Sequence, residues 1–375
     1  MPRKMHNKCL SLSTVAIAII GTVPAAAQAQ ATDAASQETS GSEPSNTVND
    51  IIVTANKREQ KLSDVGVTIT ALSGETLQAQ GVTDIASLAP LTPGLTYAPT
   101  PSSTPVYTIR GVGFFEPSLA AYPDVSLYLD QVPLPFPVLA THVAFDLERV
   151  EVLKGPQGTL FGNNATGGAV NMIHAKPSQT FQAGADLSYG RFNTIELNGF
   201  VSGPISDTLT ARFAIRAVRG DDWQKSYTRT NQPVPPEYLA VGVPDNPGRR
   251  QDTLGSKNNT AARLTLDWKP SDRLTTSFVL TGWRDRDDPT APQKVATQPG
   301  NLPGSTDPAG TVPANLPIFL YPVAPNNARA ADWTPSIRPF SNSKYWQTSL
   351  RADYELNDDL TATSISSYAS LRFLN

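Results

Sequence analysis

The amino-acid sequence predicts a small α+β domain followed by antiparallel transmembrane β-barrel strands. Three observations predict this fold class. The chain opens with a secretory signal and has no later apolar run long enough for a membrane-spanning helix. Seven segments of its second half alternate apolar and polar residues with the period of a β-strand. Apart from a short link at residues 190–193, the connections between these segments are short and long in turn, as they are in outer-membrane barrels.

Residues 1–29 have the three regions of a secretory signal peptide. Arg3, Lys4 and Lys8 supply the positive charge, residues 10–23 form the apolar stretch, and the small residues at 25–29 supply the cleavage site. A transmembrane helix is the alternative, but it needs about 20 apolar residues, which is more than this stretch has. The single cysteine, Cys9, lies within the signal, so we expect a mature chain without disulfides or a thiol nucleophile.

Residues 30–49 are small and polar, and we expect a disordered linker because they bury too little apolar surface to offset the entropy of ordering. A short β-branched segment follows the linker. It consists of Asp50, Ile51, Ile52, Val53, Thr54 and Ala55. High β-propensity beside a flexible tether suits a strand that adds to the exposed sheet edge of a partner. The alternative is an ordinary first strand of the domain that follows.

Residues 56–178 have the mixed pattern of an α+β domain. Period-2 alternation predicts strands at residues 67–70, 106–110, 125–130 and 149–153. A helix is predicted at residues 73–80, where Ser73 is a good N-cap, and a helical turn at 83–88, which we expect Pro90 to stop. The glycines of residues 155–168 resemble a phosphate-binding loop in spacing, but Gly168 stands where that loop needs Lys. We interpret them as turn glycines.

Residues 179–375 predict seven strands of roughly 9 to 13 residues, the length needed to cross a bilayer at a tilt. A soluble β-sandwich is the alternative, but its strands average about 5 to 6 residues. Seven strands cannot close a membrane barrel, because open edges would leave backbone groups unpaired in lipid. A plugged transporter barrel has roughly 22 strands. We therefore expect an incomplete barrel, with about 7 of about 22 strands, from a protein of about 800 residues.

Several motifs, in the same order along the chain, resemble those of the TonB-dependent outer-membrane receptors. The resemblance covers residues 50–375. The motifs are DIIVTANKREQKLSDVGVTITALSGE at 50–75, GVTDIASLAPLTPGLT at 81–96, Ile109-Arg110-Gly111, Leu127-Tyr128-Leu129-Asp130, and FDLERVEVLKGPQGTLFGNNATGGAVNMI at 145–173. The last run is the most specific, with one departure at Asn163, where relatives commonly carry Arg.

The resemblance implies a plug domain (residues 56–178) inside a β-barrel (from residue 179), in the outer membrane of a Gram-negative bacterium. Residues 50–55 would be the TonB box. It implies uptake of a scarce solute, most of all a ferric siderophore, energised by TonB and its inner-membrane complex. Relatives also carry aromatic compounds, glycans or cobalamin. A truncated inactive receptor is one alternative. A TonB-linked signal transducer is another, for which the segment before the box is too short.

The resemblance also implies that ligand binds between the outward plug loops and the outer barrel loops. The plug loops at 114–123 and 133–142 contain no Arg or Lys. The candidate ligand-binding residues there are Phe114, Phe115, Tyr122, Phe136 and His142. Such a surface suits an aromatic or apolar ligand face better than a bare anionic chelate. Packing beneath the loops is the alternative.

The sequence carries no signature of an enzyme, a metalloprotein or a nucleic-acid binder. Its 30 Lys and Arg against 33 Asp and Glu leave no basic footprint for a phosphate backbone. His142 and His174 lack partners at metal-ligand spacing. Asp285, Asp287 and Asp288 have oxygen ligands for Ca²⁺, but we interpret them as a solvated outer loop. We expect no catalytic residue, no metal and no cofactor. The expected partners are TonB, outer-membrane lipid and a small-molecule ligand.

Overall fold

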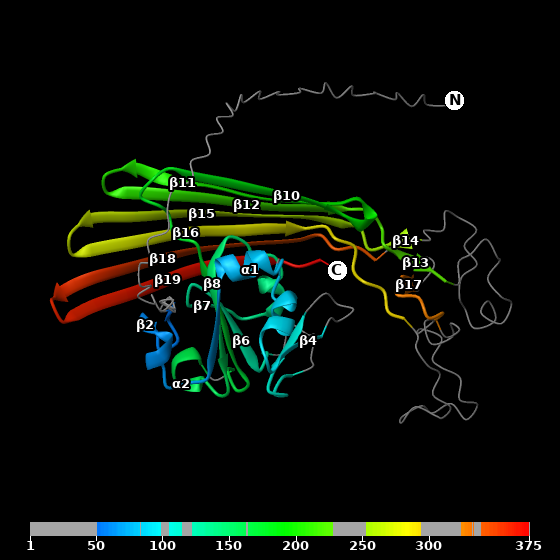
Figure 1. Cartoon of the computed structure of the whole chain (residues 1–375), viewed down its shortest axis with the longest axis horizontal. Coiled ribbons are helices and arrows are strands. Elements are labelled where there is room, and N and C mark those ends of the chain that lie inside the picture. The colour runs from blue at the N-terminus through cyan, green and yellow to red at the C-terminus, as the bar shows by residue number, and fades with distance from the viewer. Residues whose placement is uncertain are drawn as a thin grey trace, which may run out of the picture. The chain divides into compact units, whose positions relative to one another are not determined.

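The computed structural model describes residues 51–82, 84–98, 105–114, 122–162, 164–227, 253–293, 324–331, 333 and 339–374. These residues belong to one compact unit. It contains a five-stranded sheet within the α+β domain and a seven-stranded sheet in the second half of the chain (Figure 1). In the part of the chain that the structure describes, no helix is long and apolar enough to cross a membrane.

The five-stranded sheet has the strand order β3-β8-β9-β6-β7. Its strands are β3 (Ile69–Ser73), β6 (Val125–Leu129), β7 (Val132–Leu134), β8 (Leu147–Lys154) and β9 (Gly168–His174). Strands β6 and β9 are parallel, and the other pairs are antiparallel. Every residue of β6 and β9 is buried, so these two strands hold the centre of the plug core.

Shorter elements surround this sheet. Two strand pairs, β1 (Ile52–Val53) with β2 (Gln60–Lys61) and β4 (Leu95–Ala98) with β5 (Val106–Ile109), are antiparallel. The helices are α1 (Gly74–Ala79) and α2 (Gly158–Phe161), with 3-10 turns at Leu62–Asp64, Ala86–Leu91 and Pro137–Ala140. Helix α1 begins as predicted, because the Ser73 hydroxyl accepts a hydrogen bond from the Thr76 N–H at 3.2 Å.

Two local predictions for the plug are wrong. Pro90 does not stop a helical turn but lies inside the 3-10 turn Ala86–Leu91. The fixed φ of proline is close to that of a 3-10 helix, so a short turn of this kind accepts it. The strand expected at 67–70 instead occupies Ile69–Ser73, because its pairing with β8 joins Ile69 to Leu153 and Ser73 to Arg149.

The seven predicted strands are confirmed as one antiparallel sheet in sequence order. They are β10 (Gln182–Gly190), β11 (Thr194–Ser206), β12 (Leu209–Gly220), β15 (Lys257–Ser271), β16 (Leu274–Asp285), β18 (Ser343–Asn357) and β19 (Leu360–Arg372). Tight turns join β11 to β12, β15 to β16 and β18 to β19, all at one end of the sheet (Figure 1). The long connections leave from the opposite end, where the 3-10 turn Arg191–Asn193 joins β10 to β11.

The two faces of this sheet have inverted polarity. Along β12 the buried residues include Thr210, Arg212 and Arg216, whereas Phe213 on the other face is 43% exposed. Strand β15 repeats the pattern, with Arg263 buried and Trp268 exposed. A soluble sandwich would bury the apolar face. Burial of the polar face with an exposed apolar face is typical of strands that contact lipid.

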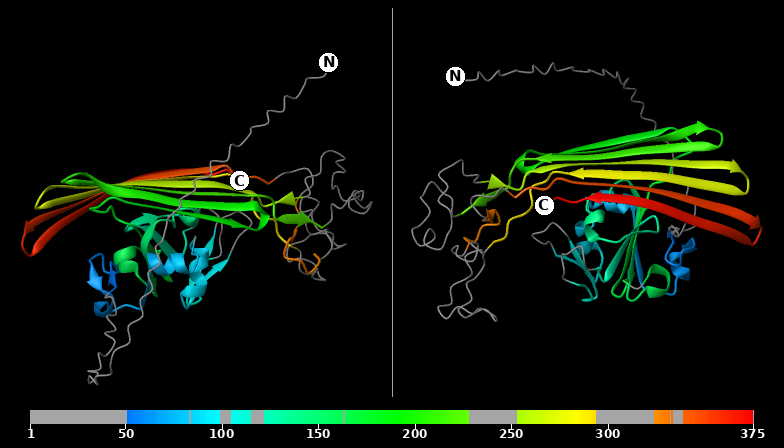
Figure 2. Two further views of the ribbon diagram at one scale, coloured as in Figure 1. Left: turned by 45° about the horizontal axis from the view of Figure 1, so that its top comes forward. Right: turned by 180° about the vertical axis from the view of Figure 1, so that it is seen from behind.

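The plug packs on the polar face of the sheet (Figure 2). Ala214, Ala261, Trp283 and Tyr345 of the sheet share a hydrophobic cluster with plug residues that include Val143. The long connections form a small sheet of β13 (Gln224–Ser226), β14 (Thr253–Leu254) and β17 (Ala330–Ala331). Reciprocal hydrogen bonds between the Gln224 side chain and the Ala291 backbone, at 2.9 and 2.8 Å, tie the two long connections together.

Candidate functional site

The segment predicted to bind TonB is docked on the plug. Asp50 lies outside the described residues. Ile52 and Val53 form β1 and pair with Lys61 and Gln60 of β2. Val53 and Ala55 are buried, in a cluster with Tyr128, Leu153, Phe161, Ala165 and Ala169. Ile52 is 41% exposed, and within the described chain β1 pairs with β2 alone. The segment therefore has one anchored face and one free strand edge.

A buried polar network fixes Thr54 of this segment. The Thr54 N–H donates to Glu151 Oε1 at 2.8 Å, and the Thr54 hydroxyl lies 3.1 Å from both Glu151 oxygens. Arg149 Nε donates to Glu151 Oε1 at 2.8 Å, and the Asn171 amide donates to the Thr54 hydroxyl at 3.2 Å. Glu151 has no exposed surface. A buried carboxylate is stable only with such partners, so Thr54 and Glu151 depend on each other.

Lys57, just beyond residues 50–55, makes further contacts with the plug. Its ammonium nitrogen lies 4.9 Å from the ring centre of Tyr128 and 4.5 Å from that of Phe161. The same nitrogen donates to the Gln131 carbonyl at 3.5 Å. Burial lowers the pKa of Lys57. Cation–π contacts of this kind stabilise a partly desolvated lysine, so the chain just after residue 55 is held on the plug as well.

The predicted ligand-binding aromatics divide into exposed and buried residues. Tyr122 is 61% exposed and stacks on Phe136, with ring centres 6.5 Å apart and an interplanar angle of 6°. Phe114 is 51% exposed, and Phe115 lies outside the described residues. The Tyr122–Phe136 pair therefore presents an aromatic face to solvent. Such a face can stack on an aromatic ligand group.

His142 does not join this aromatic face. It is 7% exposed, packs edge-on against Trp283 with ring centres 5.3 Å apart, and has Nε2 3.1 Å from Asp285 Oδ2. Trp283 in turn donates from Nε1 to the Leu139 carbonyl at 3.2 Å. In this structure His142 contacts the end of β16 instead of an open ligand surface.

The interpretation of Asp285, Asp287 and Asp288 as a solvated loop is wrong. Asp287 accepts hydrogen bonds from the Asn258 N–H at 2.6 Å and from the Asn259 amide, and Asp288 accepts from the Ser256 hydroxyl at 2.8 Å. Burial, together with the charge of Asp285, raises the pKa of Asp287. These carboxylates cap the outer ends of β15 and β16. Among the described residues, no group of three or more His, Cys, Asp or Glu is arranged to hold a metal.

Two arginines of the sheet hold the plug residues that precede β8. Arg263 donates to the Val143 carbonyl at 2.8 Å and to the Phe145 carbonyl at 2.9 Å, and its guanidinium lies 4.6 Å from the Phe145 ring centre. Arg212 binds Asp146 with two hydrogen bonds, one of 2.8 Å from Nε. Both arginines are buried. Residues 143–146 are thus an anchor between the plug and strands β12 and β15.

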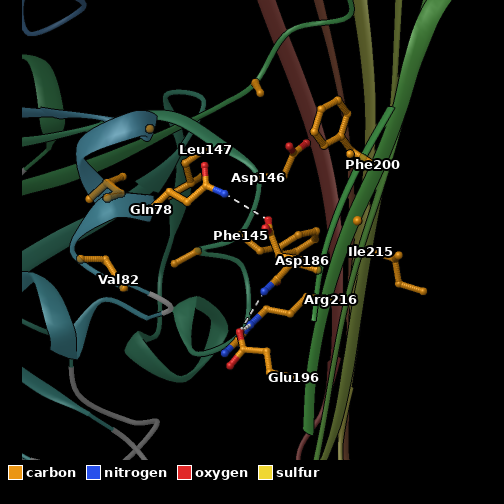
Figure 3. Close-up of a pocket in the computed structure, with 18 of the residues that line it drawn as sticks. Gln78, Val82, Phe145, Asp146, Leu147, Asp186, Glu196, Phe200, Ile215 and Arg216 are labelled. Atoms are coloured by element: carbon orange, nitrogen blue, oxygen red, sulfur yellow. Dashed lines mark hydrogen bonds and ion pairs between the residues drawn. The ribbon is translucent and has the colours of Figure 1, made fainter. Parts of the chain in front are cut away.

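A cavity of about 610 Å³ lies beside this anchor, between the plug and strands β10–β12 (Figure 3). On the plug side its wall contains Gln78 and Val82, and on the sheet side it contains Asp186, Glu196 and Arg216. Gln78 Nε2 donates to Asp186 Oδ2 across the cavity at 3.1 Å, and Arg216 Nε donates to Glu196 Oε1 at 2.8 Å. Apolar surface makes up most of the wall, and these four hydrogen-bonding side chains are set in it.

Comparison with known proteins identifies the family. Residues 61–169 match the family model "TonB-dependent Receptor Plug Domain". The chain is 30% identical over 168 residues to the pesticin receptor of Yersinia pestis, across 42% of this chain and 24% of that receptor. Residues 61–169 form a TonB-dependent receptor plug domain. It is also 28% identical over 189 residues to the iron-regulated outer membrane virulence protein of Vibrio cholerae serotype O1, across 46% of this chain and 28% of that protein.

Solved structures agree with this family at the level of the fold. The ferric yersiniabactin uptake receptor FyuA from Yersinia pestis superimposes with a TM-score of 0.61 at 21% identity, covering 82% of this chain and 41% of that one. The siderophore receptor PiuA from Acinetobacter baumannii gives 0.59 at 16% identity, covering 83% and 37%. The predicted fold, a plug with antiparallel strands of an unclosed barrel, is confirmed, as is the Gram-negative outer membrane as location.

The chain spans about a quarter of the length of the curated relatives it matches. Those relatives are receptors and not enzymes. Sequence reasoning missed its anchor residues Arg212 and Arg263. The alternation of polar and apolar residues could have identified them. Both arginines lie on the polar face of their strands, which in a lipid-facing barrel is the face toward the lumen. It missed Glu151 as well, whose partner Thr54 is 97 residues away in the chain.

Proposed function

We propose that this receptor takes up a scarce solute, most of all a ferric siderophore, by TonB-driven movement of its plug. Residues 50–55 would be the TonB box, residues 56–178 the plug and residues 179–375 part of the barrel. One observation carries the proposal. A β-branched strand with a free edge is docked on a plug that is itself seated on the polar face of a lipid-facing sheet. Such an arrangement lets a pull on the strand reach a solute held above the plug.

TonB would bind by adding a strand to β1. Strand addition needs an exposed edge and side chains of high β-propensity, and Ile52 and Val53 supply both. Since Thr54 and Ala55 are buried, a sustained pull would next strip Thr54 from Glu151. Partner binding at the exposed edge and force transfer through the buried residues are therefore separate steps.

The ligand would meet the plug at the Tyr122–Phe136 pair. An exposed aromatic stack without nearby Lys or Arg in its loops favours a ligand with its own aromatic groups. Relatives described as the ferric yersiniabactin uptake receptor and a siderophore receptor support the siderophore class. Phe114 and Phe115 belong to the same loop and are proposed to extend this face. His142 would act beneath it, through Trp283 and Asp285.

The test replaces Ile52 by Pro, which removes a backbone donor from the exposed edge. Cells that carry TonB are given siderophores loaded with radioactive iron, and surface binding is measured separately from uptake. Ile52→Pro should abolish uptake and leave surface binding unchanged, while the β-branched control Ile52→Val should keep both. Normal uptake by Ile52→Pro would contradict the role of this segment. Loss of surface binding with an intact plug would contradict a role limited to force transfer.

A further inference from the structure

Four cationic side chains form a row across the seven-stranded sheet, at the end where its long connections leave (Figure 1). The pairing register places Arg284 of β16 opposite Lys344 of β18, and Lys344 opposite Arg372 of β19. Arg219 of β12 extends the row, since its guanidinium donates to the Thr260 hydroxyl at 3.1 Å and Thr260 lies opposite Arg284. All four cations are exposed. We call Arg219, Arg284, Lys344 and Arg372 the cationic row.

The cationic row faces away from the plug. Its members in β16, β18 and β19 are sequence neighbours of Trp283, Tyr345 and Leu371. Those three residues belong to, or pack against, the hydrophobic cluster that the sheet shares with the plug. Successive side chains of a strand point to opposite faces of the sheet. The cationic row therefore lies on the lipid-facing side, which also carries the exposed Trp346 and Tyr368.

Aromatic side chains give the level of the cationic row relative to the bilayer. Trp346 comes next after Lys344 on the lipid-facing side and packs on Tyr368, with ring centres 5.4 Å apart. Tyr354 lies on the same side nearer the tight turn and is 44% exposed. Barrels carry aromatic girdles at both membrane interfaces, and the stretch from Trp346 to Tyr354 has the length, roughly 9–11 residues, of a strand that crosses a bilayer. The cationic row lies just beyond the girdle at the end of the long connections, at the level of the lipid headgroups.

The described part of the chain supplies no counter-charge for the cationic row. Arg219 donates to the Val218 and Asn259 carbonyls, both at 2.7 Å. Arg284, Lys344 and Arg372 form no ion pair with any residue that the structure describes. Like charges directly opposite each other on neighbouring strands destabilise a sheet. An anion bound from outside the chain would remove this cost.

The opposite end of the sheet has the opposite charge. Long cationic side chains that only extend toward water would suit both ends of a membrane strand equally. The tight turns at the other end instead contain one cation, Arg273, with the acidic residues Asp207, Asp272, Asp358 and Asp359. Cations confined to one end indicate an anionic ligand confined to one leaflet.

We propose that the cationic row binds the phosphate groups of lipopolysaccharide, a glycolipid with several phosphates. Long connections lie on the outer side of an outer-membrane barrel, so the row meets the outer leaflet. Arginine binds phosphate through two parallel hydrogen bonds, and lysine binds it as a point charge. Neighbouring strands lie about 4.8 Å apart, so the row from β12 to β19 extends over roughly 19 Å. A single phosphate cannot contact that length, which favours this glycolipid over a glycerophospholipid. The proposal rests on the orientation of the sheet in the membrane and is independent of the imported solute.

The test measures the binding of purified lipopolysaccharide to the receptor in a non-ionic detergent, with a chelator present so that divalent cations cannot bridge the anions. The variant Arg284→Gln/Lys344→Gln removes two adjacent charges and keeps the length of both side chains. Its Kd for lipopolysaccharide should rise at least tenfold. Lipopolysaccharide should raise the Tm of the unmodified receptor, because a ligand that binds only the folded state stabilises it, and most of this rise should be lost in the variant. Without lipopolysaccharide the variant should be at least as stable as the unmodified receptor, since the repulsion between opposite cations is gone.

The matched control is Lys269→Gln/Arg273→Gln, which removes two exposed cations at the end of the tight turns and should change the Kd less than twofold. Equal weakening in both variants would reveal a general attraction to anions and would overturn the proposal, as would unchanged binding in Arg284→Gln/Lys344→Gln.

Three other ligands are measured in parallel: phosphatidylglycerol, dephosphorylated lipopolysaccharide and inorganic phosphate. Each should bind the unmodified receptor at least tenfold more weakly than lipopolysaccharide does. Equal binding of phosphatidylglycerol would assign the cationic row to any anionic lipid, equal binding of the dephosphorylated form would assign the affinity to acyl chains or sugars, and equal binding of inorganic phosphate would assign the row to a free anion. Each of these results would overturn the proposal.

Discussion

Glu151 has no exposed surface and accepts hydrogen bonds from the Thr54 N–H, the Thr54 hydroxyl and Arg149 Nε. Replacing it by Gln puts an amide N–H₂ where an acceptor is needed and leaves the buried Arg149 with only the partly exposed Glu148 as a charged partner. Loss of one member of a buried ion pair costs about 3 to 5 kcal/mol. We predict that Glu151→Gln undocks residues 51–55, seen as increased mobility of a spin label at position 52.

Glu148 provides the matched control for this prediction. It also pairs with Arg149, but its side chain is 40% exposed. An exposed pair of this kind contributes about 0 to 1 kcal/mol, so Glu148→Gln should leave the label as immobile as in the unmodified receptor. Equal mobility in the two variants would show that the Thr54–Glu151 contact does not hold the segment.

Asp130 gives the plug a defined dependence on pH. Burial alone would raise the pKa of Asp130, but the charge and hydrogen bonds of His174, 2.7 Å away, and the charge of Arg263 lower it overall. A carboxyl with a lowered pKa stabilises the fold above its unfolded pKa of about 3.9, and this stability is lost as the pH falls through the folded value. We predict that β6 and β9 lose hydrogen-exchange protection as the pH falls from about 5 to about 3.

Asp130→Asn should remove this pH dependence and lower the protection already at neutral pH. Replacement of the exposed Asp64 by Asn serves as the control and should leave the pH profile unchanged. An identical profile in the Asp130 variant would assign the loss of protection to other carboxyls.

At the scale of elements, the lipid-facing strands predict that the cost of a charged substitution depends on its depth in the bilayer. Leu264 lies mid-strand in β15 and Leu274 at the first residue of β16, next to the tight turn, both on the apolar face. An arginine costs about 2 to 4 kcal/mol at the bilayer midplane and about 0 to 1 near the interface. We predict that Leu264→Arg lowers the amount of folded receptor in the outer membrane and that Leu274→Arg does so far less. Equal loss would contradict a lipid-facing β15.

The sequence predicted best those elements whose two faces have different environments, one buried and the other exposed to water or lipid. Alternation at period 2 located the seven strands, because each has two different environments. Strand β9 was missed since all of its residues, Gly168 to His174, are buried and show no alternation. Gly168 was interpreted as a turn glycine, yet it begins this strand at a φ of +146°, where a Cβ would lie 2.3 Å from the Leu153 carbonyl oxygen.

The candidate site was predictable in part for the same reason. The β-branched composition of residues 51–55 reports their strand propensity, which is a local property. Their docking on Glu151 and Lys57's contact with Tyr128 and Phe161 depend on residues far along the chain. The aromatic loops were identified by composition, but composition does not separate Tyr122, which is exposed, from His142, which Trp283 and Asp285 cover.

At the scale of the whole molecule, the proposed partner segment and the proposed ligand face are separate structures. Ile52 lies in β1 and pairs with β2, whereas Tyr122 stacks on Phe136. Neither appears in the hydrogen bonds that anchor the plug to the sheet. Sites without shared partners behave additively in free energy. Ligand affinity and maximal uptake rate should therefore respond to different substitutions.

We predict that Tyr122→Ala raises the Kd of the transported iron complex about two- to twelvefold, since an aromatic pair contributes about 0.5 to 1.5 kcal/mol. At saturating ligand its maximal uptake rate should stay normal. Ile52→Ala should lower the maximal rate and leave the Kd unchanged, because it weakens only the strand edge offered to the partner. The double variant should show both the raised Kd and the lowered maximal rate, each within about twofold of its value in the corresponding single variant. A Tyr122→Ala receptor with a reduced maximal rate at saturation would show instead that the aromatic stack and the docked segment are coupled through the plug.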